Sequence, residues 1–280
     1  MFGTAGKRTG PAAFMWVPIA FVFGCVGAVL LSIAQFSPTL LPSAVIQFAW
    51  LALTQGLFVS LVLGIGTMFV PLTSHKRSSV DVTLSDHPRR RRVGQLLAAV
   101  GIALSFALEA QGFFLVARLL RAALVLITLI VAAGIHRPPT MPGTQRKLIW
   151  IASWCLPIGL LLTAVLPNLL QIGLHVLFIG GLLLVTLSVA LHVGLAHSSG
   201  QALVSKPVGA VRAFGALLML ALALRIVAEL DMAHRYDWVA ASAGVLLLSL
   251  LPWGWLILPR LLPALKGSAD TASQTGIDRT

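Results

Sequence analysis

Residues 93–135 read VGQLLAAVGIALSFALEAQGFFLVARLLRAALVLITLIVAAGI, and the number of helices in this stretch decides the topology of the chain. A membrane-spanning helix needs about 20 apolar residues, so the stretch is long enough for two. Gln111-Gly112 lies near its centre and is typical of a tight turn. We therefore predict two spans, at about 93–110 and 113–135. One span followed by a re-entrant segment is the alternative.

Apolar runs of the same kind recur along the whole chain. The sequence has 280 residues, of which 58% are hydrophobic and only 10% are charged, whereas soluble domains carry about 25% charged residues. This predicts an all-α polytopic transmembrane helical bundle of about eight spans, embedded in a lipid bilayer. The spans are expected at about 12–34, 44–72, 93–110, 113–135, 148–166, 170–197, 208–230 and 238–262 of a single transmembrane domain, residues 1–265. The polar tail, residues 266–280, is expected to be disordered.

The basic residues indicate how the chain is oriented in the membrane. The net charge of +12 could suggest a nucleic-acid partner. We expect none, because the basic residues lie in short loops between apolar runs, where they act as orientation signals. Eight spans place the RRRR run at 89–92, the loop at 136–147 and both termini on one side, which we predict to be cytoplasmic. One span fewer between 93 and 135 would break this pattern.

Three histidines lie in the predicted helix at 170–197, where imidazole is costly in hydrocarbon. His175 lies one turn into this helix, and His197 ends it. At ~100° per residue the two lie on nearly the same face but about 33 Å apart along the axis, too far to bind one metal ion together. His192 lies on a different face. Neutral imidazole binds haem iron, copper or zinc; a packed histidine bonded to a backbone carbonyl is the alternative.

Charged side chains occur near the ends of several spans. Arg118 and Arg121 lie three residues apart and therefore on one face of the helix at 113–135. The favoured interpretation is that they reach out to the lipid headgroups. The alternative is that they hold an anionic group such as a haem propionate. Glu109 could pair with either arginine, and we predict that Arg225 and Glu229, at i and i+4, form an internal ion pair.

The helix at 170–197 resembles a known family. The run His175…Gly180…Thr186…Ala196-His197-Ser198-Ser199 is similar to the segment of the NnrS family written H-A-L-x-x-G…T-L…G-H-T-G-R. NnrS proteins are polytopic membrane proteins described as haem- and copper-containing, and they are associated with bacterial denitrification and nitric-oxide stress. The resemblance implies a multi-pass protein of the bacterial inner membrane. It also implies haem or copper binding with His175 and His197 as candidate ligands, and Arg118 and Arg121, in ARLLRA, also look like a family helix.

The sequence also departs from the family pattern. The family's G-H-T-G-R is A-H-S-S-G here, and the family usually has about twelve spans. The family's early H-A-H-E-M helix can be placed on the helix at 44–72, where Ala49, Leu51 and Ala52 then occupy the positions of the two histidines and the glutamate. We therefore expect a short, diverged member that lacks at least one metal site of the family.

Three functions remain open from the sequence. The first is a haem- or copper-binding protein linked to nitric-oxide or respiratory metabolism. The second is a cofactor-free structural or accessory subunit of a larger membrane complex. The third, a small-molecule transporter, ranks last because the charged residues lie near the membrane surfaces rather than at the midplane. The sequence contains no recognisable nucleophile–base pair, so an enzyme is disfavoured, and any catalysis would be redox chemistry at a bound cofactor.

Overall fold

The computed structural model describes residues 12–37, 39–74, 88–198 and 200–277, with side chains as far as Arg260. Within these ranges the secondary structure is helical and contains no strand. The principal helices are α1 (Trp16–Phe36), α2 (Ser43–Leu51), α3 (Leu57–Ser74), α5 (Pro88–Ala110), α6 (Phe114–Thr128), α7 (Thr144–Val165), α8 (Leu170–His175), α9 (Leu184–Ala196), α10 (Gly209–Leu230) and α11 (Arg235–Ile277). Three π-helical segments, Ala52–Gly56, Leu129–Ala133 and Val176–Leu183, continue α2, α6 and α8 without a break in the helix.

Eight helical segments of the described chain are long and apolar enough to span a membrane, as predicted. The stretch at 93–135 does form two of them, Arg89–Ala110 and Phe114–Ala133. Gly112 makes the turn between them with a φ of +91°, a conformation that favours glycine. Two spans begin about one turn earlier than predicted, at Arg89 and Thr144, because their first turns are polar and carry no apolar signal.

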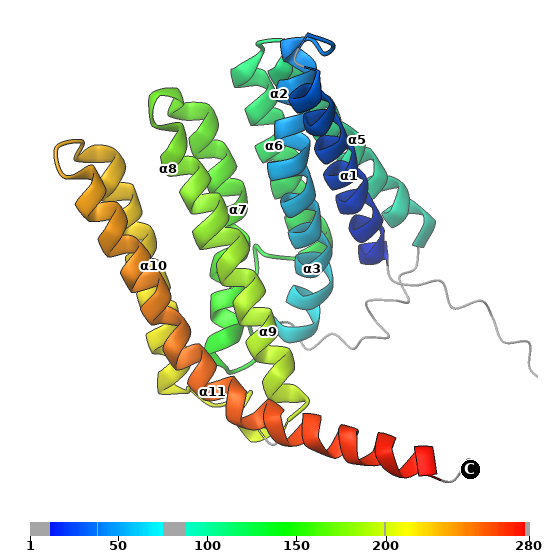
Figure 1. Cartoon of the computed structure of the whole chain (residues 1–280), viewed down its shortest axis with the longest axis vertical. Helices are drawn as coiled ribbons and strands as arrows, with labels where there is room; N and C mark the ends of the chain where they lie inside the picture. Colours follow the sequence, from blue (N-terminus) through cyan, green and yellow to red (C-terminus); the bar gives the residue numbers. More distant parts are fainter. Residues whose placement is uncertain (1–11, 38, 75–87, 199, 278–280) are drawn as a thin grey trace, which may run out of the picture.

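The spans alternate in direction, so their connections gather at two ends of the bundle (Figure 1). The Gly112 end contains the turns at 39–42, 111–113, 166–169 and 231–234. The Gly143 end contains the segments at 134–143 and 200–208. This alternation decides which side chains can meet, because residues from different helices come together only when they lie at the same height.

The α7 helix lies between two groups of helices, with α1–α6 on one side and α10–α11 on the other (Figure 1). It packs against the continuous α8–α9 helix at very short range. A Cβ added to Gly173 would lie 2.6 Å from the backbone nitrogen of Thr163, and one added to Gly159 would lie 2.6 Å from that of Leu177. Only glycine allows two helices to approach so closely, a common device in membrane proteins. The α1 span lies at the edge of the bundle and is only 17% buried, whereas the α2–α3 span packs among other helices and is 61% buried.

The last helix is longer than the sequence suggests. The backbone of α11 continues as helix to Ile277, past the predicted end of the span at 262 and into the tail that was expected to be disordered. Residues 263–277 include three alanines but also a proline, two glycines and four Ser or Thr residues, so helix propensity alone does not account for this extension. A helix that is already formed extends at low cost, because nucleation is the expensive step.

Candidate functional site

Three charged side chains from α5 and α6 lie together near the Gly112 end, and we call them the Glu109 cluster. Glu109 Oε1 accepts a hydrogen bond from Arg118 Nε at 2.8 Å, and its Oε2 accepts one from Arg121 Nη2 at 2.6 Å. The turn at Gly112 produces this geometry, because α5 ends one residue after Glu109 and α6 returns beside it. Arg118 also donates to the carbonyl of Thr163 on α7 at 2.9 Å.

Arg121 occupies the centre of the Glu109 cluster and uses each of its guanidinium nitrogens. Its Nη1 donates to Gln55 Oε1 at 2.5 Å and its Nε to Ser105 Oγ at 3.1 Å. Its guanidinium carbon lies 4.5 Å from the centre of the Phe106 ring, a cation–π arrangement. The π-helical segment Ala52–Gly56 carries Gln55 to this position. Arg121 is 1% exposed and Glu109 3%, so the cluster is a satisfied polar network inside the bundle.

The interpretation that Arg118 and Arg121 reach the lipid headgroups is therefore wrong. Both side chains turn inward because Glu109 offers a carboxylate at the same height, and a buried cation needs a counter-charge in a low-dielectric interior. The pairing of Glu109 with either arginine is confirmed for both. An anionic group of a cofactor would have to compete with Glu109 for these donors, so a role in cofactor binding for the two arginines stays a prediction.

The second polar group at the Gly112 end is the His175–Arg225 pair, in which α8 meets α10. Arg225 Nε donates to His175 Nε2 at 2.8 Å, and both side chains are half-buried. Since a guanidinium has no acceptor, His175 is assigned as the neutral tautomer with its hydrogen on Nδ1. This Nδ1 is buried and makes no well-aligned hydrogen bond within the described residues, and the carbonyl of Gln171 is the backbone group that interacts with it.

The predicted ion pair between Arg225 and Glu229 is wrong. Glu229 pairs with Arg235 instead, at 3.3 Å between Oε1 and Nη2. The turn after Leu230 brings the first residue of α11 back over Glu229, whereas Arg225 lies one turn deeper and meets His175. A spacing of four residues permits contact within a helix, but an acceptor on a neighbouring helix competes for the same donor.

The two histidines of the family motif are far apart in the structure. His175 ends α8 at the Gly112 end, whereas His197 follows the last residue of α9 at the Gly143 end and is exposed. The prediction that they share a face assumed an uninterrupted α-helix. This premise is wrong because residues Val176–Leu183 are π-helical, and their wider turns rotate everything that follows. His192 is half-buried, and its Nδ1 makes no hydrogen bond in the described part of the chain.

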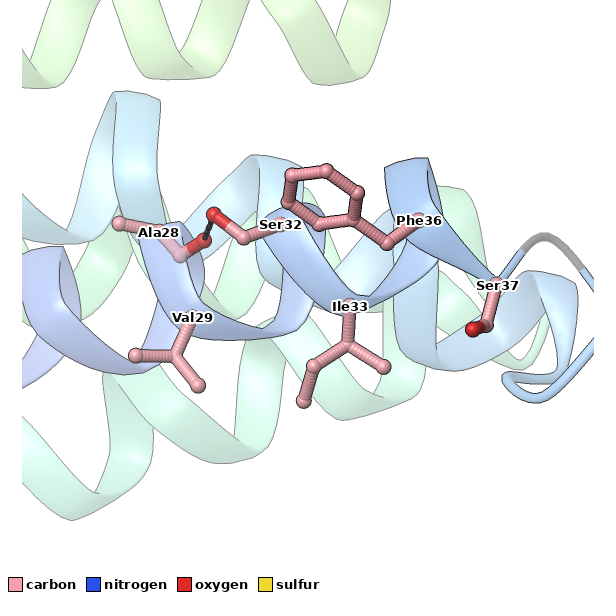
Figure 2. A pocket seen from close by; sticks show the side chains of 6 residues that line it. All are labelled: Ala28, Val29, Ser32, Ile33, Phe36 and Ser37. Atoms are coloured by element: carbon pink, nitrogen blue, oxygen red, sulfur yellow. Dashed lines mark hydrogen bonds between the residues drawn. The ribbon is translucent and has the colours of Figure 1, made fainter.

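An open groove of about 400 Å³ lies along α1 near the Gly112 end. Figure 2 shows its lining, which comes from one face of α1 and the residue that follows it: Ala28, Val29, Ser32, Ile33, Phe36 and Ser37. The hydroxyl of Ser32 donates to the carbonyl of Ala28 at 2.8 Å and is thus occupied within its own helix. The groove offers no imidazole, thiol or charged side chain, so we place the candidate site at the His175–Arg225 pair instead.

Comparison with protein families identifies one family whose model covers nearly the whole chain. The model of the family described as NnrS protein matches residues 6–264, which include both motif histidines and all eight spans. The chain belongs to the NnrS family. Neither the curated proteins nor the solved structures gave a significant match.

In the alignment of the early NnrS helix with α2, the positions of the two histidines and the glutamate are closely packed. Ala49 and Ala52 are completely buried. A Cβ added to Gly27 of α1 would lie 2.7 Å from the Ala49 carbonyl oxygen and 2.8 Å from the Leu53 nitrogen. The α1 helix therefore packs against this segment, and the buried positions of Ala49 and Ala52 leave little room for larger side chains, whereas Leu51 is half-buried.

The residues present restrict which metal or cofactor could fit the described part of the chain. Within the described ranges, no group of three or more His, Cys, Asp or Glu side chains could hold a metal ion. A copper centre that needs three protein ligands therefore does not fit these ranges. A haem held by one axial imidazole requires a single neutral histidine, and the tautomer assigned to His175 fits that requirement.

Sequence reasoning missed several partners of these groups. The sequence analysis did not identify Gln55 and Ser105, which bind Arg121, or Arg235, which pairs with Glu229. Gln55 gave a signal that could have been used, because an amide within a long apolar helix is costly without a partner. Nothing in the sequence identified the partner, since Gln55 and Arg121 are 66 positions apart.

Proposed function

We propose that this NnrS-family membrane protein acts in nitric-oxide response, denitrification or respiratory metabolism, and that it binds haem or copper through His175. The observation that carries the proposal is the neutral imidazole of His175, at the family's motif position, held by Arg225 at 2.8 Å. We also propose that the chain lies in the bacterial inner membrane with both termini in the cytoplasm. The basic loops at the Gly143 end support this orientation.

The chain's own residues would prepare His175 as a ligand. Arg225 fixes the imidazole ring and keeps the lone pair on Nε2, the atom that would face a metal. Binding through Nε2 requires this arginine to turn aside, after which its charge remains available for an anionic group nearby. Glu229 and Arg235 neutralise each other and leave Arg225 as the adjacent cation. Bound haem or copper would supply one-electron chemistry that protein side chains lack.

The chemical form of the cofactor follows from the fit described above. Haem is favoured over copper at His175, because an axial iron ligand can be a single imidazole. His197 would need a separate site at the opposite end, since the two histidines cannot meet. Arg118 and Arg121 are candidates for a propionate only if Glu109 yields one of its two bonds.

The decisive experiment is an absorption spectrum with metal analysis of the purified full-length protein. We expect a Soret band that His175→Ala removes or shifts. His234→Ala is the matched control, because His234 lies at the same end but is exposed and bonded to Asp231. His197→Ala tests the second motif position in the same preparation. A folded, colourless and metal-free wild-type protein would contradict the proposal.

A cofactor-free accessory subunit is the second candidate, and the packing of α2 favours it. Ala49 and Ala52 are buried against α1 at the positions where the NnrS pattern has candidate ligands. Loss of ligands with retention of the helix packing would leave a protein that works by contact with other membrane subunits. Co-purification with a larger complex and no activity alone is the expected result. A monodisperse protein that carries haem by itself would argue against it.

A further inference from the structure

Unpartnered polar atoms gather at the Gly143 end, where α7 begins, and they are independent of the haem or copper proposal. Arg146 is 5% exposed, and its Nε is buried and makes no hydrogen bond within the described residues. On α9, Ser188 Oγ and His192 Nδ1 are also buried without such a partner. An unsatisfied buried polar atom costs about 1–3 kcal/mol, so several in one region indicate a missing partner.

The packing of α7 against α9 brings these atoms together. Gly173 lies against Thr163, and Gly181 lies against Leu156, which sets an antiparallel register between the two helices. Continued along both helices, this register places Arg146 level with His192. The electrostatic interaction between these two side chains agrees with it.

The charge of Arg146 is unbalanced in the part of the chain that the structure describes. The acidic residues whose side chains are described, Glu109, Glu229, Asp231 and Asp237, all lie at the opposite end of the bundle. Arg146 donates through Nη1 to the carbonyl of Pro142, which is neutral. A buried guanidinium without a counter-charge is unfavourable, and an anion beside it would remove that cost.

The start of α7 adds a second reason to expect an anion. Arg146 lies in the first turn of this helix, where the helix dipole disfavours a cation. The turn contains no acidic residue, and the preceding Gly143 supplies no side-chain cap. Backbone N–H groups at a helix N-terminus bind oxyanions readily. The side chain of Arg146 bonds back to Pro142, so its guanidinium lies over this terminus.

We propose that the first turn of α7, together with Arg146 and His192, forms a binding site for a phosphate-type oxyanion. The guanidinium and the backbone N–H groups donate to its oxygens, and so does His192 Nδ1 when it carries the ring proton. Gln145 holds the segment at 201–204 over the site by donating to the Val204 carbonyl. Its free Oε1 suits hydrogen phosphate, whose hydroxyl donates to it. The phosphate comes either from solution or from an anionic lipid headgroup, which offers the same chemistry.

The test measures binding of inorganic phosphate to the full-length protein in uncharged detergent, by calorimetry and by thermal stability. We expect saturable binding that Arg146→Gln weakens about tenfold or more, as loss of a charge-assisted hydrogen bond does. Lys147→Gln is the matched control, because it removes one charge from the next, exposed residue. We expect it to change the affinity less than about twofold. Arg146→Lys keeps the charge without the planar fork and should lie between the two.

A second arm identifies the source of the phosphate. The protein is placed in nanodiscs of phosphatidylcholine alone or with phosphatidylglycerol. Stabilisation by phosphatidylglycerol that Arg146→Gln abolishes, without binding of free phosphate, assigns the site to a lipid headgroup. Binding of free phosphate in phosphatidylcholine nanodiscs assigns it to a soluble oxyanion. Both results support the site.

Three results would overturn the proposal. The first is a folded wild-type protein that responds to neither phosphate nor phosphatidylglycerol. The second is an equal loss of binding in Lys147→Gln, which would indicate a general basic surface. The third is phosphate binding that appears only after Asp81, Asp86, Asp270 and Asp278 are changed to Asn. The structure does not describe these four side chains, and that result would mean that the chain itself supplies the anion.

Discussion

The Glu109 cluster and the His175–Arg225 pair lie at the same end of the bundle, on either side of α7, yet they are built in opposite ways. In the cluster, two arginines share one carboxylate, and partners from α2 to α7 cover them until Arg121 is 1% exposed. In the pair, one arginine holds one imidazole, and both are half-buried. The first arrangement satisfies its own charges, whereas in the second a single donor, Arg225, occupies Nε2 of the imidazole that we propose as a ligand.

This difference supports a structural role for the Glu109 cluster and is compatible with the cofactor role that we propose for His175. A closed charged network specifies which helices pack together, and opening it costs several kcal/mol. A half-buried imidazole with a single donor can exchange that donor for a metal at much lower cost. His175 therefore lies in the pair, which can change its partner at low cost. Arg118 and Arg121 lie in the Glu109 cluster, where a change of partner is costly.

Replacing the shared carboxylate should have the largest effect. Glu109→Gln leaves two buried guanidinium groups without their counter-charge, and we expect a loss of about 3–5 kcal/mol in the free energy of unfolding. Thermal or denaturant unfolding in detergent measures it. Asp237→Asn, at an exposed acid of the same end, is the control and should stay within about 0.5 kcal/mol. Equal effects of the two changes would show that the cluster does not hold the helices together.

A double variant sharpens this result. Glu109→Leu with Arg121→Met removes both members of a buried pair, so it should cost less than the sum of the two single changes. Strict additivity would mean that the two side chains do not act as one unit.

The helix contact that separates the two groups should be the next most sensitive. A Cβ at Gly173 would lie 2.6 Å from the Thr163 nitrogen and 2.7 Å from the Gly159 carbonyl oxygen, so Gly173→Ala must push α7 and α8 apart. We expect a loss of about 1–3 kcal/mol. Gly94→Ala is the control, because a Cβ there meets nothing within 4 Å, and it should be neutral or stabilising. Equal stability of the two variants would contradict the close approach.

Removing the donor of His175 should have a smaller effect. Arg225→Leu deletes one hydrogen bond at a half-buried position, so we expect a loss of about 1 kcal/mol. It should also change the ¹⁵N chemical shifts of the His175 ring, since Nε2 loses its partner. Arg212→Leu, at an exposed position of the same helix, should change neither. Unchanged ring shifts in Arg225→Leu would show that the pair does not form.

The smallest effect is expected at the turn between α10 and α11. The indole of Trp238 donates to Asp231 Oδ2 at 2.9 Å, and this bond, followed by those to His234, holds the pKa of Asp231 below its ordinary value. The lowered pKa adds stability that is complete above about pH 4, the unfolded value, and is lost as the pH falls through the folded one. Asp231→Asn should flatten this part of the stability profile. An unchanged profile would contradict the contribution of Asp231.

Particular residues show which features could be predicted from the sequence and which could not. The turn at Gly112 was predicted from a Gln-Gly pair, and it placed Glu109 near both arginines as an open possibility. The direction of those arginines was predicted incorrectly, because headgroups and Glu109 are both suitable partners and the sequence does not say which is nearer. The assumption of a continuous α-helix between His175 and His197 was also wrong, since no sequence signal marked the π-helical turns between them.

The sequence alone determined that this chain is a helical membrane protein with eight spans, and its motif histidines indicated the resemblance to the NnrS family. It could do so because length, hydropathy and basic loops act locally, one segment at a time. Tertiary structure decided that Arg121 meets Gln55 and that Arg225 meets His175 rather than Glu229. These contacts join helices far apart in sequence, and they depend on helix register and close glycine packing, which hydropathy does not record.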